Sequence, residues 1–200
     1  MIPENIQRFV QAFSRLPSIG PRQATRLAFR LIASGKNHIA ALSQALAGLA
    51  QVQICSQCFF VHTHPHTTLC SICSDSHRAQ DMFMIIEKET DLISIERTGK
   101  YVGKYLVLGE LTKSGVLEDI HKARLSVLKR TIESLPAKQA QEIIIALNPN
   151  TYGDLHTNLL IKELTTYTKK ITRLGRGIPT GGEIEFADED TLGHSLERRV

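Results

Sequence analysis

Four cysteines are the residues of this chain whose types and spacing point most clearly to chemistry. They form two Cys-x-x-Cys pairs separated by eleven residues, namely Cys55, Cys58, Cys70 and Cys73. Two such pairs can fold back on each other and present four thiolates tetrahedrally to one zinc ion. Four protein ligands leave no open position for water or substrate, so such a site stabilises a fold and does no catalysis. The spacing therefore predicts one structural Zn²⁺ per chain.

Two other roles for this region remain open from the residues alone. Disulfide bonds need an oxidising compartment, but the chain begins Met1-Ile2-Pro3-Glu4-Asn5, which does not resemble a secretory leader. We therefore expect reduced thiols in a cytoplasmic protein. His62, His64 and His66 lie between the two cysteine pairs and could replace a ligand, although four cysteines already complete a site. We expect these three histidines to be solvated loop residues.

A second group of polar residues follows the apolar runs in the C-terminal half. Glu87 ends the run 83–86, and Asn148 to Asp154 follow the run 143–147. Apolar runs that alternate with predicted helices indicate a parallel sheet, whose ligands bind at the carboxyl ends of the strands. The arrangement resembles the Toprim domain of topoisomerases and primases, in which a glutamate ends one strand and Asp-x-Asp-x-x-Gly ends a later one.

This Toprim-like pattern departs from its relatives at the charged positions. Glu87 and Gly153 match, but Asn148 and Asn150 occupy the two aspartate positions. Magnesium-dependent phosphoryl transfer needs clustered carboxylates to hold the cation, and neutral amides supply oxygens without charge. We therefore predict no enzymatic activity; the alternative is a Mg²⁺-dependent Toprim enzyme, primase-like or nuclease-like.

Three arginines near the N-terminus recur at i, i+4 and i+8: Arg22, Arg26 and Arg30. They share one face of a predicted helix, and Gly20 places the free N–H groups of that helix where an anion can approach. Such a row can neutralise successive DNA phosphates without reading base sequence, although a solvated face is the alternative. The stretch 16–21 resembles the helix-hairpin-helix element of DNA-binding and repair proteins, with Ser18 where glycine is usual.

Hydrophobic periodicity gives the elements that position these residues. It predicts helices over 6–16 and from the hairpin to Gly35, and a third helix with Ile39, Leu42, Leu46 and Leu49 facing inward. It then predicts strands at 83–86, 105–108, 143–147 and 171–173, alternating with helices at 90–97, 122–134 and 155–167, and a last helix at 188–199. The glycine-rich stretch 173–182 lacks the lysine of a phosphate-binding loop and is predicted to be a flexible connection. No apolar run is long enough for a membrane span, so we expect no membrane association, and the net charge of +4 permits a polyanion partner.

In this order, the pieces resemble the RecR family of bacterial recombination mediators over nearly the whole chain. The most specific matches are the hairpin, Arg26–Phe29, the cysteines, Thr98–Tyr105, Asn148-Pro149 and Thr172–Gly182. The resemblance implies an α+β, multidomain fold. We expect a helix-hairpin-helix module for DNA binding and oligomerisation at 1–53, a four-cysteine zinc finger at 54–76, a Toprim-like α/β domain at 77–174 and a C-terminal docking segment at 175–200.

The resemblance also implies a function in DNA repair. Members of this family act without catalysis, together with RecO and in many bacteria RecF, to load RecA onto single-stranded DNA covered by SSB. They form ring-like dimers or tetramers, which predicts a nucleoid-associated homo-oligomer that binds single- and double-stranded DNA. The family's DNA-contacting residues correspond to Arg22 and Arg26, with Arg30 on the same face. Its partner-binding face corresponds to Glu87, Asp91 and Asp154.

Two departures from the family bear on partner affinity. Tyr152 stands where an acidic residue is usual, and 109–119 is shorter than expected.

A third possible function is that of a zinc-ribbon regulator that reads base sequence. No helix in the sequence shows the mixture of Asn, Gln and Arg that is typical of a major-groove reader, which disfavours this role.

Overall fold

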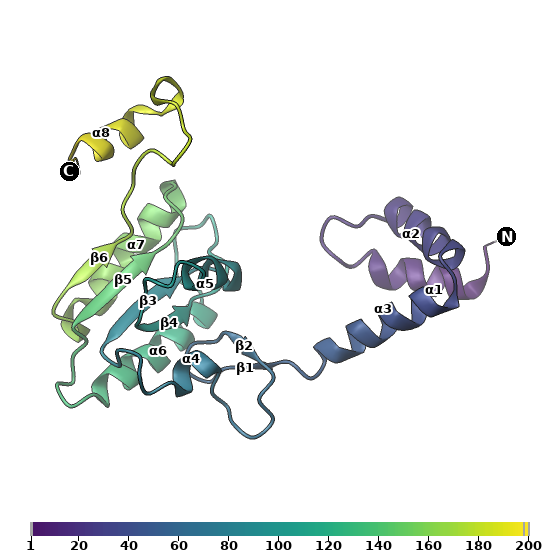
Figure 1. Cartoon of the computed structure of the whole chain (residues 1–200), viewed down its shortest axis with the longest axis horizontal. Helices are drawn as coiled ribbons and strands as arrows, with labels where there is room; N and C mark the ends of the chain where they lie inside the picture. Colours follow the sequence, from purple (N-terminus) through teal and green to yellow (C-terminus); the bar gives the residue numbers. More distant parts are fainter. Residues whose placement is uncertain (1, 198, 200) are drawn as a thin grey trace. The chain divides into compact units, whose positions relative to one another are not determined.

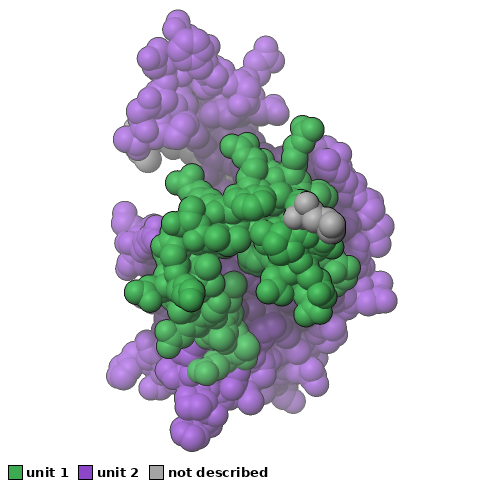
Figure 2. All heavy atoms as spheres, turned by 90° about the vertical axis from the view of Figure 1, so that its right-hand side faces the viewer, with its two compact units in different colours: residues 1–52 green, residues 53–200 purple. Residues whose placement is uncertain are grey.

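The computed structural model describes residues 2–197 and 199, and its chain forms two compact units, 1–52 and 53–200 (Figures 1 and 2). The predicted fold class is confirmed: N-terminal hairpin helices, a four-cysteine cluster, an α/β domain with a parallel sheet and a C-terminal helix. Within the described residues, no helix is long and apolar enough to cross a membrane. The predicted internal boundaries at 54, 77 and 175 stay predictions.

The first unit consists of three helices: α1 (Glu4–Phe13), α2 (Pro21–Ala33) and α3 (Lys36–Leu49). Ile6 of α1 and the small residues Ala24 and Ala28 of α2 are buried, which lets α1 and α2 pack closely. The first helix is shorter than predicted, because turns replace it after Phe13 and Leu16 is exposed.

The hairpin between α1 and α2 uses a different residue for its tight turn than its sequence indicates. Ser18, not Gly20, adopts the left-handed conformation, with φ of +64°. Gly20 is extended, with φ of −82°, and caps the N-terminus of α2 ahead of Pro21. The backbone thus has positive φ at the position where related hairpins carry glycine. Ser18 adopts this conformation although its Cβ makes it sterically unfavourable.

The prediction that the apolar side of α3 faces inward is wrong within this unit. The helix has no buried residues, and Leu46 and Leu49 are 56% and 65% exposed. Ile39 and Leu42 are also exposed. The physical reason is that α1 and α2 together offer too little surface to cover α3. The apolar side of α3 therefore remains exposed in the isolated chain.

The second unit is built on a four-stranded parallel sheet in the order β4-β3-β5-β6. The strands are β3 (Met82–Ile86), β4 (Lys104–Val107), β5 (Glu142–Ala146) and β6 (Ile171–Arg173). The intervening helices are α5 (Glu89–Glu96), α6 (Asp119–Glu133) and α7 (Thr151–Leu164), followed by the short 3-10 helix η1 (Thr165–Tyr167). Helix α7 begins four residues earlier than predicted, so Asp154 lies in its first turn.

Both faces of this sheet are covered, as the unbroken apolar strands predict. One face packs against α6 and α7 through residues such as Ile85, Leu128 and Leu160. The other face carries Met84, Ile86 and Val107, and its cover consists of α5 and the four cysteines. The cysteine segment therefore takes the place that a second helix would occupy in a larger α/β domain.

The cysteine segment is a compact knuckle with little regular structure. It contains the antiparallel strands β1 (Gln53–Ile54) and β2 (Val61–His62) and the single-turn helix α4 (Ser71–Ser74). None of these elements was predicted, because two-residue strands leave no periodic signal.

Beyond β6 the chain forms the 3-10 helix η2 (Ile184–Phe186) and α8 (Glu189–Glu197). The predicted last helix extended from 188 to 199; residue 198 lies outside the described residues, and Arg199 is not helical, so the predicted end is wrong.

Candidate metal centre and strand-end site

The four cysteines form one buried cluster. Their sulfur atoms all lie within 4.8 Å of one another, and the Sγ atoms of Cys58 and Cys70 are 3.5 Å apart. Zinc–sulfur bonds of about 2.3 Å in a tetrahedron would place sulfurs about 3.8 Å apart, so the cluster fits such an ion. All four are free thiols. The alternative of two disulfides is therefore not what the structure shows.

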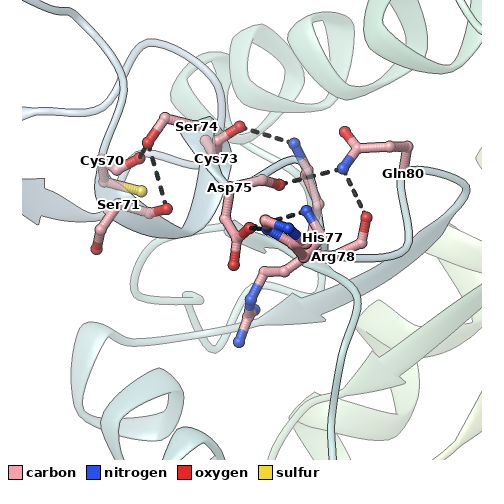
Figure 3. A network of polar contacts seen from close by, with 9 residues as sticks. Cys70, Ser71, Cys73, Ser74, Asp75, His77, Arg78 and Gln80 are labelled. Carbon is pink, nitrogen blue, oxygen red and sulfur yellow. Dashed lines mark hydrogen bonds and ion pairs between the residues drawn. The ribbon is translucent and has the colours of Figure 1, made fainter.

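Backbone hydrogen bonds fix the orientation of the thiols. The N–H of Phe60 donates to Cys58 Sγ at 3.5 Å, and that of Cys70 donates to Cys55 Sγ at 3.4 Å. Figure 3 shows the second Cys-x-x-Cys pair, Cys70–Cys73, which we call the second hook; there Ser74 Oγ donates to the carbonyl of Cys70 at 3.0 Å and closes α4. Donors aimed at sulfur stabilise the thiolate form, which is the form that binds a metal.

The mutual hydrogen bonds of these thiols shift their pKa values in opposite directions. Hydrogen bonds from Cys58, Cys70 and Cys73 lower the pKa of the Cys55 thiol, whereas the hydrogen bond to Cys55 is the largest cause that raises the pKa of Cys58 and of Cys73. Four thiolates cannot coexist at this spacing without a cation, because each repels the others. A divalent metal would supply that charge, and the donor set is one that suits zinc.

The histidines of the loop do not join this cluster. Within the described residues, the group close enough to hold a metal contains cysteines only. His64 and His66 are exposed, as predicted. His62 is buried instead, and its Nδ1 accepts from the N–H of His64 at 3.2 Å.

The knuckle is attached directly to the edge strand β4. The carbonyl of Cys58 accepts from the N–H of Val107 at 2.8 Å, so it satisfies an outward backbone group of that edge. The carbonyl of Cys73 accepts from Nζ of Lys104 at 2.7 Å. The guanidinium carbon of Arg124 lies over the ring of Phe59, 5.0 Å from the ring centroid. Loss of the knuckle would therefore leave both an edge and a face of the sheet unprotected.

A second site lies at the carboxyl ends of β3 and β5. Glu87 is only 9% exposed, and its Oε2 accepts from Nδ2 of Asn148 at 2.8 Å. Its other oxygen accepts from the N–H of Leu111 at 3.4 Å and lies 3.9 Å from Nζ of Lys88. Both carboxylate oxygens thus have protein partners. An amide N–H₂ group occupies the place where a Toprim enzyme has a second carboxylate.

Gly153 is required by the geometry of this edge. A Cβ atom built at this position would lie 1.9 Å from the carbonyl oxygen of Asn148. The Gly153 N–H donates to Oδ1 of Asn150, the N-cap of α7, at 2.8 Å. The glycine that completes the Toprim pattern is therefore needed so that the helix can start directly beside the strand end.

The two other predicted acidic residues are each bound by neighbouring groups. Oδ2 of Asp91 accepts from the N–H of Lys88 at 2.9 Å and closes the capping box of α5. Asp154 is paired with both Arg173 and Arg176. Its partial burial opposes ionisation, but the hydrogen bonds from these arginines outweigh it and hold the pKa of Asp154 below its usual value.

This cluster of Arg173, Asp154 and Arg176 was not predicted. The stretch 173–182 was expected to be a flexible connection, whereas the structure joins its first residues to α7 through two ion pairs. The available signal was the presence of two arginines within a short stretch that follows the last strand. Their partner lies about twenty residues earlier in the chain and could not be chosen from spacing.

The three arginines of the N-terminal unit lie on α2. Arg22, Arg26 and Arg30 are all exposed, and their spacing puts them on one side of the helix. No side chain caps the N-terminus of α2, and its first turn contains no acidic residue. Free N–H groups and guanidiniums therefore combine into a positive surface that can accept an anion.

Comparisons with known families agree with this architecture. Residues 6–49 match the family described as RecR, helix-hairpin-helix, and residues 177–200 match RecR, C-terminal. Residues 81–175 match the Toprim domain.

Individual relatives align along the full chain. The chain is 38% identical over 201 residues to the recombination protein RecR of Chloroflexus aggregans, covering 100% of this chain and 95% of that protein. It is 37% identical over 195 residues to RecR of Bifidobacterium adolescentis, covering 97% and 94% of the two chains. It is 35% identical over 200 residues to RecR of Gloeobacter violaceus, covering 100% and 98%. Together with the hairpin, the cysteine cluster and the Toprim sheet, these matches show that the chain belongs to the RecR family.

Proposed function

We propose that this protein is a non-catalytic recombination mediator that binds DNA and helps RecO, and in many bacteria RecF, to load RecA onto SSB-coated single strands. The observation that carries the proposal is the surface of α2, where Arg22, Arg26 and Arg30 are exposed beside an uncapped helix N-terminus. This surface suits phosphate, because a row of guanidiniums along one helix side can neutralise successive backbone phosphates. It therefore favours binding of single- and double-stranded DNA without sequence preference.

The strand-end site supports the absence of catalysis. Glu87 is engaged by Asn148, and the negative charge of Asp154 is offset by two arginines. A site for Mg²⁺ needs uncommitted carboxylates that converge on one point. The positions that supply them in a Toprim enzyme are here amides, so the alternative of a primase-like or nuclease-like enzyme is disfavoured.

We assign a binding role to the same edge of the sheet. Glu87, Asp91 and Asp154 lie at the ends of strands or in the first turns of the helices that follow. A cavity of about 290 Å³ there is lined by residues that include Asp91, Asn148, Arg173 and Arg176. In our proposal RecO contacts this edge, and the partner meets the mixed charges of Asp154 and its arginines.

Zinc is the metal we assign to the cysteine cluster, with one ion per chain. The four buried thiols suit a soft, tetrahedral ion, and a closed site of this kind stabilises structure. The residues that would hold it are Cys55, Cys58, Cys70 and Cys73. The ion would supply positive charge among the thiolates and no reactive water.

We further propose that the protein is a homo-oligomer, a dimer or tetramer. Phe29, Ile32, Leu46 and Leu49 leave apolar side chains exposed on α2 and α3. In the C-terminal segment Ile184 is exposed, and Phe186 is 79% exposed. Exposed apolar residues concentrated on two separate segments are typical of surfaces that subunits bury. Several α2 surfaces around one strand would then multiply the strength of a weak interaction.

The DNA-binding assignment predicts a strong effect of removing charge from α2. With Arg22, Arg26 and Arg30 replaced by alanine, we expect affinity for single-stranded DNA to fall at least about 10-fold at moderate salt. The slope of log K against log salt is negative, and its magnitude should fall by about 0.7 for each phosphate that the variant no longer neutralises. Fluorescence anisotropy of labelled oligonucleotides over a salt series measures both quantities.

Arg8→Ala is the matched control, because Arg8 lies on α1 in the same unit and is paired with Glu4 at 2.6 Å. It should leave the DNA affinity and the salt slope nearly unchanged. Circular dichroism of the triple variant should retain its helical signal, since these side chains are exposed. An unchanged isotherm for the folded triple variant would refute the assignment of α2.

A further inference from the structure

Lys104 is a buried cation with an unusual environment. It is the first residue of the edge strand β4 and is 8% exposed. Its Nζ donates to the carbonyl oxygen of Cys73 at 2.7 Å. Among the described residues, no aspartate or glutamate lies within ion-pair distance of this ammonium group.

Such an arrangement is costly by itself. An ammonium group loses its hydration on burial, and one backbone carbonyl does not compensate for a full charge. Buried lysines are therefore normally paired with an acidic group. The ionisable residue in direct contact with Lys104 is Cys73, whose carbonyl is its hydrogen-bond partner and which also lines the small cavity at its side chain.

A metal bound by the four thiolates would supply the missing partner. Four thiolates and one divalent ion leave a formal charge of about −2 inside the protein. We propose that Lys104 is the counter-charge of this centre and that it positions the second cysteine hook through the Cys73 carbonyl. This inference rests on the proposed zinc site, and it adds a residue outside the cysteine segment that sets the affinity of the site.

A counter-charge responds to the metal in a way that an ordinary structural residue does not. When the metal is bound, neutralising Lys104 removes a favourable charge interaction and weakens binding. When the metal is absent, that charge interaction is absent as well, and neutralising Lys104 only removes a buried cation. The same substitution should therefore destabilise the metal-loaded protein and leave the metal-free protein equally or more stable.

Two neutral variants test this inference in the full-length protein. Lys104→Met removes both charge and donor, whereas Lys104→Gln removes the charge but keeps an N–H donor. Competition for Zn²⁺ against a chromophoric chelator should show about 10-fold weaker binding for both, which is the lower end for groups that support metal ligands. Lys100→Gln is the control, because Lys100 is an exposed lysine four residues earlier, and it should bind zinc as the wild type does.

Spectra and melting curves complete the test. The charge-transfer bands of the Co²⁺-substituted variants should still report tetrahedral thiolate ligation, which excludes a misfolded site. Melting temperatures should be lower than that of the wild type with metal bound and equal to it or higher without metal. Lys104→Arg, which keeps the charge, should bind zinc more tightly than Lys104→Gln even if Lys104→Met does not fold.

Equal zinc affinity of Lys104→Gln and Lys100→Gln would overturn the inference, as would an equal loss of stability with and without metal. A wild-type protein that binds no zinc would instead refute the proposed metal centre. The two failures are therefore distinguishable.

Discussion

Replacing Cys58 and Cys70 with alanine should abolish metal binding and lower the unfolding free energy of the second unit by at least about 4 kcal/mol. The cluster is a large part of the cover on one sheet face, where it packs with Met84, Ile86 and Val107. Within the described residues no disulfide joins the two cysteine pairs, so without the metal only the intervening chain and hydrogen bonds would hold them together. The apolar face and the β4 edge would then be exposed.

Denaturant titration followed by circular dichroism measures this loss, and bound zinc is counted by elemental analysis. Ser71→Ala is the matched control, because Ser71 lies in the same hook with an exposed side chain and should change neither quantity. Extraction of the metal from the wild type with a strong chelator should reproduce the effect of the double variant. If the double variant were as stable as the wild type, that result would contradict a structural role for the cluster.

Gly153→Ala should destabilise the second unit by about 3 kcal/mol or more, even though alanine favours helices over glycine. The added Cβ would lie 1.9 Å from the carbonyl oxygen of Asn148, so α7 or the end of β5 must move. That movement would also disturb the hydrogen bond between Asn148 and Glu87 at the strand-end site.

Gly193→Ala provides a control of opposite sign. Gly193 lies inside α8, and an added Cβ meets no atom within 4 Å, so the change should leave stability unchanged or raise it by up to about 1 kcal/mol. Thermal and denaturant unfolding of the two variants are directly comparable. Equal stability of Gly153→Ala and the wild type would show that the strand-end geometry is not as tight as the structure indicates.

The features that could be predicted from the sequence are those encoded by local spacing. The two cysteine pairs specify a four-sulfur site without knowledge of the fold, and the apolar strands specify a sheet covered on both faces. The ends of those strands identify Glu87 and Asn148 as neighbours, because parallel strands end at one edge. The structure brings these two side chains into direct contact.

What could not be predicted depends on interactions between distant segments. Lys104 meets Cys73 across 31 positions, and Asp154 meets Arg176 across 22, so no periodic signal marks either pair. Ser18 shows a different limit, since glycine is the usual sign of positive φ and the backbone imposes it on a serine. The exposed side of α3 was predicted as core because an apolar helix face looks the same whether this chain or another subunit covers it.

We infer that the protein binds DNA and partners and that its Toprim sheet performs no chemistry. Incubating the purified protein with Mg²⁺ or Mn²⁺, nucleotides and labelled DNA tests this most directly, with wild type and Glu87→Gln compared for binding and turnover together. We expect both proteins to bind DNA equally and to return it uncut and unextended. Metal-dependent turnover by the wild type that disappears in Glu87→Gln would contradict the claim.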